Sequence, residues 1–187
     1  LVLAWMHGDE PDLAHVYPRA KLQGPDGKKI IKEKWPELYR KLDLDHKPYE
    51  GWGLGAHPVN DTQADYKRIK RIDPTRPVVV NLSKAVAYNG KLKGRGDRSG
   101  HPEDYPGYIK GADWISWDMY PVAYGVPDEL WRVSQGMDAL AEWGAKDKPM
   151  MFIAEAGFGE KWADHHQQRA QVWLAINHGA TGITWFC

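Results

Sequence analysis

The feature that most constrains the fold of this chain is a set of five short apolar segments, each of which ends in polar residues. They lie at residues 1–5, 78–82, 114–117, 150–154 and 182–186. Their short length and their content of Val, Ile and Trp favour strands over helices. Their nearly continuous apolar character is typical of a parallel sheet that is covered on both faces. We therefore expect five buried parallel strands.

Helical patterns separate these segments. Apolar residues recur at helical spacing in residues 61–72, 127–144 and 164–178, and shorter helices are expected at 37–41 and 102–110. Alternation of strands and helices predicts βαβ units, and hence an α/β fold. Two long loops, residues 17–60 and 84–103, follow the first two strands. They lie on the carboxyl side of strands, where parallel α/β folds place their sites.

Composition narrows the classes of partner. The 187 residues carry 25 basic and 25 acidic side chains, so no nucleic acid or anionic membrane is expected as partner. No apolar run approaches the ~20 residues of a membrane span. The single cysteine, Cys187, excludes an intrachain disulfide and a Cys-based zinc site. Ten Trp and nine Tyr against three Phe favour either a core of large aromatics or a surface that grips sugars.

The residues that close the apolar segments carry the functional signal. In chain order they are Asp9 and Glu10, Asn81, Asp118 with Tyr120, Glu155, and Trp185. In a barrel, the carboxyl ends of the strands meet around one cavity, so these side chains are expected to converge. Glu155 is the most telling, because four apolar residues lead into it and a charge there is costly to bury without a reason.

Two facing carboxyl groups surrounded by aromatic residues are what glycoside hydrolysis needs. One carboxyl must be protonated to donate to the leaving oxygen, and the other must be ionised to attack the anomeric carbon or to activate water. Structural alternatives remain for both glutamates. Glu10 fits a helix start at which Asp9 or Asp12 caps and Pro11 takes the first turn, and Glu155 fits a buried ion pair.

The sequence resembles the carboxyl-terminal half of a clan A glycoside hydrolase. The matching stretches, in chain order, are "HGDEPD" for the acid/base element, "RIDPTRPVVVNL" and "ADWISWDMYPV" for strands five and six, "FIAEAGFG" for the nucleophile element, and "GATGITWF" for strand eight. The likeness is greatest to bacterial members with a Gly-Asp-Glu-Pro-Asp element and a helix that ends as "AQVWLAINHGA" does here.

The resemblance implies a (β/α)₈ TIM barrel of which residues 1–187, as one domain, supply about strands 4–8. It implies a retaining mechanism with Glu10 as acid/base and Glu155 as nucleophile, and a contact between Tyr120 and the nucleophile. From their places at the strand ends, Asp9, Asn81, Asp118, Tyr120 and Trp185 are expected to bind the substrate. Asp9 stands where most of the clan has Asn, which bonds the sugar 2-hydroxyl.

The same resemblance implies no cofactor, and it implies a polysaccharide or oligosaccharide substrate and a secreted or periplasmic location. A full barrel takes ~250 residues. The chain has no initiator Met and begins in a strand-like run, so we expect it to be a piece of a longer protein that needs the missing amino-terminal strands.

Two rival functions remain open at this point. The first is a metal-dependent hydrolase or lyase on the same barrel, because His7 precedes Asp9 and Glu10; His57, His165 and His166 offer no spacing typical of a metal motif, so no metal site is predicted. The second is a barrel that binds carbohydrate without cleaving it.

Overall fold

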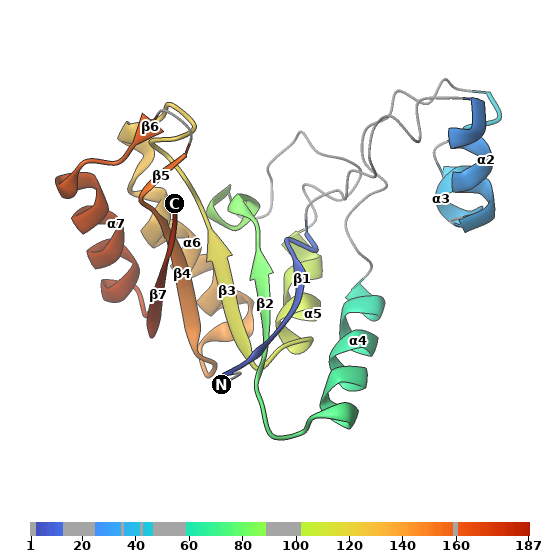
Figure 1. The fold of residues 1–187 in the computed structure, drawn as a ribbon, viewed down its shortest axis with the longest axis horizontal. Helices are drawn as coiled ribbons and strands as arrows, with labels where there is room; N and C mark the ends of the chain where they lie inside the picture. The colour runs from blue at the N-terminus through green and yellow to red at the C-terminus, as the bar shows by residue number, and fades with distance from the viewer. Residues whose placement is uncertain are drawn as a thin grey trace.

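The computed structural model describes residues 3–12, 25–34, 36–41, 43–46, 59–88, 102–158 and 161–187. Its centre is a parallel sheet of five strands whose order, β1-β2-β3-β4-β7, follows the chain. The strands are β1 (Trp5–Asp9), β2 (Val78–Leu82), β3 (Trp114–Asp118), β4 (Met150–Glu155) and β7 (Gly182–Phe186). Figure 1 shows the five strands side by side and running in the same direction.

Helices connect successive strands of this sheet. They are α4 (Val59–Ile72), α5 (Tyr105–Lys110), α6 (Arg132–Leu140) and α7 (His165–Asn177), with short helical turns η1 (Lys84–Tyr88), η2 (Pro102–Asp104), η3 (Pro127–Glu129) and η4 (Ala141–Ala145). Two short strands, β5 (Gly157–Phe158) and β6 (Lys161–Trp162), form an antiparallel pair between β4 and α7. The predicted α/β alternation on a parallel sheet is therefore confirmed.

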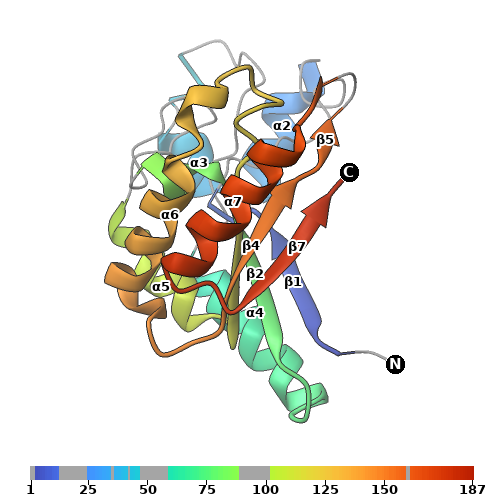
Figure 2. The ribbon, with the colours of Figure 1, turned by 90° about the vertical axis from the view of Figure 1, so that its left-hand side faces the viewer.

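The two faces of the sheet differ in chemistry, and this difference positions the candidate site. Alternate side chains such as Leu82, Trp117 and Phe152 are fully buried in a core with α5 and α6. Burial of each such side chain contributes about 1.5–3 kcal/mol. In Figure 2, α5, α6 and α7 lie along one face of the sheet. The intervening residues Asn81 and Asp118 point to the opposite face, because strand side chains alternate.

Some predicted boundaries were wrong. The first strand begins at Trp5 rather than at residue 1, because its ladder opens where the Trp5 N–H donates to the Pro77 carbonyl, 2.9 Å away. β1 borders the sheet, so it buries only His7, and apolar character is a poor guide to its extent. The helix expected at 127–144 is broken into η3, α6 and η4, and Gly144 has a φ of 105°.

The first long loop is partly helical. It contains α2 (Pro25–Lys34), which the sequence pattern did not predict, and α3 (Pro36–Lys41), which includes the helix expected at 37–41. These helices pack on each other around Ile31, Tyr39 and Leu44. Residues 17–24, 35, 42 and 47–58 of this loop, and residues 89–101 of the second, fall outside the described residues.

The sheet has the strand order of a section of a (β/α)₈ barrel, but the described strands do not close. Within the described residues, β1 pairs only with β2, and β7 only with β4. Large apolar side chains such as Met6 and Trp185 are exposed on these two border strands. None of the helices described here is long and apolar enough to cross a membrane.

Candidate active site

A bulge at the end of β1 brings Asp9 and Glu10 to the site. Met6 lies opposite Val79, but Asp9 rather than Gly8 lies opposite Asn81, so β1 carries one extra residue. Gly8 lies in this bulge and has a φ of 65°, a conformation that glycine adopts at little energetic cost. Residues 11–12 make a turn, and the residues in which a helix starting near Glu10 would continue lie outside the described part of the chain.

The backbone of Glu10 is itself unusual. Its φ is 48°, in the left-handed region that non-glycine residues rarely occupy. The Glu10 N–H donates to the Asn81 carbonyl oxygen at 2.8 Å, which fixes this conformation against β2. Strained residues of this kind cost about 1–3 kcal/mol and cluster at functional sites. Glu10 is thus held at the carboxyl end of the strands by a defined contact.

Asn81 connects two carboxyl groups across three strands. Its side-chain amide donates to Asp9 Oδ1 at 3.0 Å and to Asp118 Oδ2 at 3.2 Å. Ser116 Oγ donates to Asn81 Oδ1 at 2.9 Å, so the orientation of the amide is set. Tyr120 donates its hydroxyl proton to Asp118 Oδ2 at 3.1 Å. The structure therefore brings Asp9, Asn81, Asp118 and Tyr120 together, as the strand ends predicted.

Asp118 is the most perturbed carboxyl of this network. It is 7% exposed, and its Oδ1 is buried with no hydrogen-bond partner in the described part of the chain. Burial raises the pKa of Asp118 to about 6, against the hydrogen bonds from Asn81 and Tyr120, and the negative charge of Asp9 adds to the rise. Asp118 therefore changes its charge near neutral pH, as groups in functional sites often do.

A cavity of about 210 Å³ lies beside this network. It is lined by Asp9, Glu10, Lys84, Asp118, Tyr120, Tyr124 and Phe186. Three carboxyl groups therefore share one cavity with three aromatic rings. The Tyr120 ring stacks on Phe186 with centroids 4.9 Å apart, and Lys84 Nζ lies 3.9 Å from the Tyr124 ring centroid.

Glu155 lies at the same end of the sheet but does not line this cavity. Its side chain is 1% exposed, and its two carboxylate oxygens accept hydrogen bonds from the Val122 N–H at 2.8 Å and the Ala123 N–H at 2.9 Å. Burial raises the pKa of Glu155, and the two amides partly offset that rise. Among the described residues, no Lys or Arg pairs with Glu155, so the buried ion pair considered above is not formed there.

Trp185 is placed on the other side of β7. It lies opposite Ala154, which belongs to the core packed against the helices, whereas Phe186 lies opposite Glu155. Phe186, rather than Trp185, therefore reaches the cavity. The sequence pattern could not decide between them, because residues 182–186 are apolar on both faces.

The sequence pattern around Asp12 indicates only a helix cap, but the structure gives this residue another role. It is buried and accepts three hydrogen bonds: from the Ser83 N–H at 2.9 Å, from Ser83 Oγ at 2.6 Å and from the Tyr105 hydroxyl at 2.8 Å. Burial raises the pKa of Asp12, and these donors work against the rise. Asp12 thus fastens the segment after Glu10 to the end of β2 and to α5.

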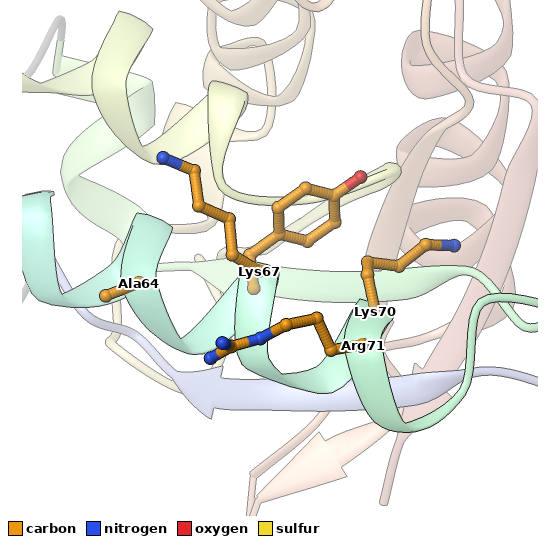
Figure 3. Close-up of a pocket in the computed structure, with 5 residues that line it drawn as sticks. Ala64, Lys67, Lys70 and Arg71 are labelled. Atoms are coloured by element: carbon orange, nitrogen blue, oxygen red, sulfur yellow. The ribbon is translucent and has the colours of Figure 1, made fainter.

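A larger cavity, of about 600 Å³, lies elsewhere and differs in chemistry. It is lined by Ala64, Tyr66, Lys67, Lys70 and Arg71, all on α4, and Figure 3 shows their side chains. Tyr66 donates to Asp113 at 2.7 Å, and Lys70 lies 3.3 Å from the same carboxylate. The residues that line this cavity include no acid for proton transfer, so we place the candidate site at the strand ends.

A metal centre finds no support in the described residues. They contain no group of three or more His, Cys, Asp or Glu side chains arranged to hold a metal ion. His165 and His166 lie at the start of α7 with ring centroids 3.8 Å apart. His57 lies outside the described residues.

Comparisons with known proteins relate the fold to two glycosidases. No protein-family model and no curated protein sequence matches the chain. A candidate alpha-L-fucosidase from Bacteroides thetaiotaomicron VPI-5482 aligns over 86% of this chain and 52% of its own, with a TM-score of 0.50 and 16% identity. A beta-galactosidase from the Antarctic haloarchaeon Halorubrum lacusprofundi aligns over 99% of this chain and 32% of its own, with a TM-score of 0.54 and 13% identity.

At these identities the likeness concerns the fold alone. The chain spans about half the length of the first of these proteins and about a third of the second. The chain therefore has a glycosidase-like α/β fold, built on a parallel sheet of five strands.

Proposed function

We propose that this chain carries the catalytic residues of a retaining glycoside hydrolase that cleaves O-glycosidic bonds. One observation carries the proposal: carboxyl groups and aromatic rings line the same cavity at the carboxyl end of a parallel sheet. Aromatic faces suit the apolar faces of sugar rings, and carboxyl groups suit both the hydroxyls and the proton transfers. The glycosidase-like fold supports the same conclusion.

In this proposal Glu10 is the acid/base. It lines the cavity, and its backbone is fixed against β2. Glu10 donates its proton to the leaving oxygen as the glycosidic bond breaks, and it later takes a proton from the attacking water. Asp9, Asn81, Asp118 and Tyr120 bind the sugar around it. Trp185 was expected to stack on the sugar, and Phe186 takes that role here because it lines the cavity.

Glu155 is the nucleophile in the same proposal. It ends β4, on the sheet face that also carries Phe186, and two amides favour its ionised form. Its carboxylate attacks the anomeric carbon and forms a glycosyl ester, which water then hydrolyses. The substrate is an oligosaccharide or polysaccharide, no cofactor takes part, and further barrel strands complete the enzyme.

Removal of Glu155 and removal of Glu10 should affect turnover differently when the full-length variants are tested on aryl glycosides. Glu155→Ala should abolish turnover of all of them, and added azide should restore it with an inverted glycosyl azide as product. Glu10→Ala should still react with substrates that have good leaving groups, and azide should then give a product of retained configuration. Glu142→Ala, which removes a carboxyl of η4 that does not line the cavity, is the matched control and should behave as wild type. If both variants keep wild-type turnover, the assignment is wrong.

A carbohydrate-binding barrel without hydrolytic activity is the second candidate. It is favoured by one observation, the burial of Glu155 behind hydrogen bonds to both of its oxygens. Such a protein would bind oligosaccharides in calorimetry and leave every aryl glycoside intact, and it would show no product with azide in either variant.

A further inference from the structure

One turn, residues 121–125, contacts Glu155 and also contributes to the wall of the cavity. We propose that this turn is a positioning element for Glu155: two of its amides hold the buried carboxylate ionised and oriented, and the carboxylate in return holds the aromatic wall of the cavity. The inference rests on the proposed function, in which Glu155 is the nucleophile.

The hydrogen bonds of the turn explain why these two amides are available. The Tyr124 N–H donates to the carbonyl oxygen of Tyr120, directly before the turn, at 2.9 Å, and within the turn the Gly125 N–H donates to the Val122 carbonyl oxygen at 2.9 Å. The amides of Val122 and Ala123 precede these bonds, and each donates instead to a different oxygen of Glu155. Adjacent backbone amides that converge in this way form an anion-binding nest.

The two amides of the nest stabilise the negative charge of Glu155, and they do so without a cation among the described residues. The side chain is 1% exposed, and no Lys or Arg pairs with it among the described residues. Burial disfavours the ionised form, whereas hydrogen bonds from two amides favour it. The main chain of Glu155 is fixed as well, because its N–H donates at 3.0 Å to the side chain of the buried Gln171 on α7.

The turn also forms one wall of the cavity. Tyr120, directly before it, stacks on Phe186, and Tyr124, within it, lies 3.9 Å from Lys84 Nζ. Both tyrosines line the cavity. A hydrogen bond from Val122 or Ala123 to Glu155 therefore sets the position of the wall as well as that of the carboxylate.

The proposed reaction changes this contact. When Glu155 attacks, the new bond from one carboxylate oxygen to the anomeric carbon replaces the bond to the leaving oxygen, which takes a proton from Glu10. The ester has no net charge, so its oxygens accept hydrogen bonds more weakly than the carboxylate did. Hydrolysis restores the carboxylate and the full contact. The amides therefore favour breakdown of the ester, because they bind its leaving carboxylate.

The test removes a donor and leaves Glu155 intact. Ala123→Pro in the full-length protein deletes the N–H that reaches Glu155 Oε2, and Ala123→Ser keeps that N–H while it changes the side chain. The acid limb of kcat/KM on an aryl glycoside reports the ionisation of the nucleophile and of Asp118, and only the nucleophile loses a hydrogen bond in Ala123→Pro. We expect the limb of Ala123→Pro to lie about 0.5–1 pH unit above that of Ala123→Ser, because the ionised form has lost a hydrogen bond. Identical limbs in two folded variants would overturn the proposal.

A second measurement does not depend on the fold of any variant at position 123. In the wild-type protein with ¹⁵N-labelled Val and Ala, the amide signals of residues 122 and 123 should titrate together with the Glu155 carboxyl, and Glu155→Gln should abolish that titration. Amide signals that are independent of pH would refute the nest. If they titrate but azide never gives an inverted product from Glu155→Ala, the nest stands and the proposed function fails.

Discussion

Replacement of Asp118 by Asn should become more stabilising, relative to the wild-type protein, as the pH rises from acid to neutral. Asp118 is buried, its Oδ1 has no partner among the described residues, and burial raises its pKa from 3.8 to about 6. The folded state therefore binds one more proton than the unfolded state between these two values. The asparagine side chain of the variant resembles the protonated acid in shape and cannot ionise.

The magnitude follows from the two pKa values. The stabilisation that protonated Asp118 provides is complete below pH ~4 and is lost as the pH rises through about 6. The difference between the two pKa values corresponds to about 3 kcal/mol of unfolding free energy. The stability of Asp118→Asn relative to wild type should therefore change by about 3 kcal/mol in favour of the variant between pH ~4 and pH ~7.5.

Urea unfolding of both full-length proteins across this pH range measures the effect. Asp12 and Glu155 also have pKa values raised by burial, but they are present in both proteins and cancel in the comparison. Asp128→Asn, which makes the same change at an exposed carboxyl of η3, is the control variant. If the stability difference between Asp118→Asn and wild type varies by less than about 0.5 kcal/mol, burial does not hold the proton on Asp118.

Two further substitutions test the packing that supports the site. Asp12→Ala should lower the unfolding free energy by about 3 kcal/mol, because buried donors on Ser83 and Tyr105 lose their acceptor; Asp128→Ala should change it by less than about 0.5 kcal/mol. An equal effect of the two in urea unfolding would contradict this. Gly136→Ala should cost about 2 kcal/mol, because the added Cβ would overlap the Trp117 ring; an unchanged or raised melting temperature would show that Trp117 moves aside freely.

The sequence predicted well those features that depend on local patterns. The strands at 78–82 and 182–186 have the expected bounds, because each is a short and mainly apolar run. The helix expected at 164–178 is also present as α7. Asp164 caps it and forms a capping box with Gln167.

Features that depend on which face of a strand carries a side chain were harder to predict. Trp185 and Phe186 are adjacent in an apolar strand, so a shift of one residue exchanges which of them faces the cavity. The register with β4 decides the matter, since it pairs Phe186 with Glu155. Similarly, the Ala123 amide that binds Glu155 belongs to a turn 32 residues away in sequence, and no local sequence pattern predicts that contact.

The strained backbone of Glu10 is stabilised from both sides. Before it, Asp9 accepts a hydrogen bond from the side chain of Asn81, and Glu10 itself donates to the main chain of Asn81. After it, Asp12 accepts two hydrogen bonds from Ser83. Both anchors lie at the end of β2, in residues that are themselves buried. A strain of about 1–3 kcal/mol persists only where surrounding contacts over-determine the conformation, and these contacts hold Glu10 at the cavity while its side chain remains partly accessible.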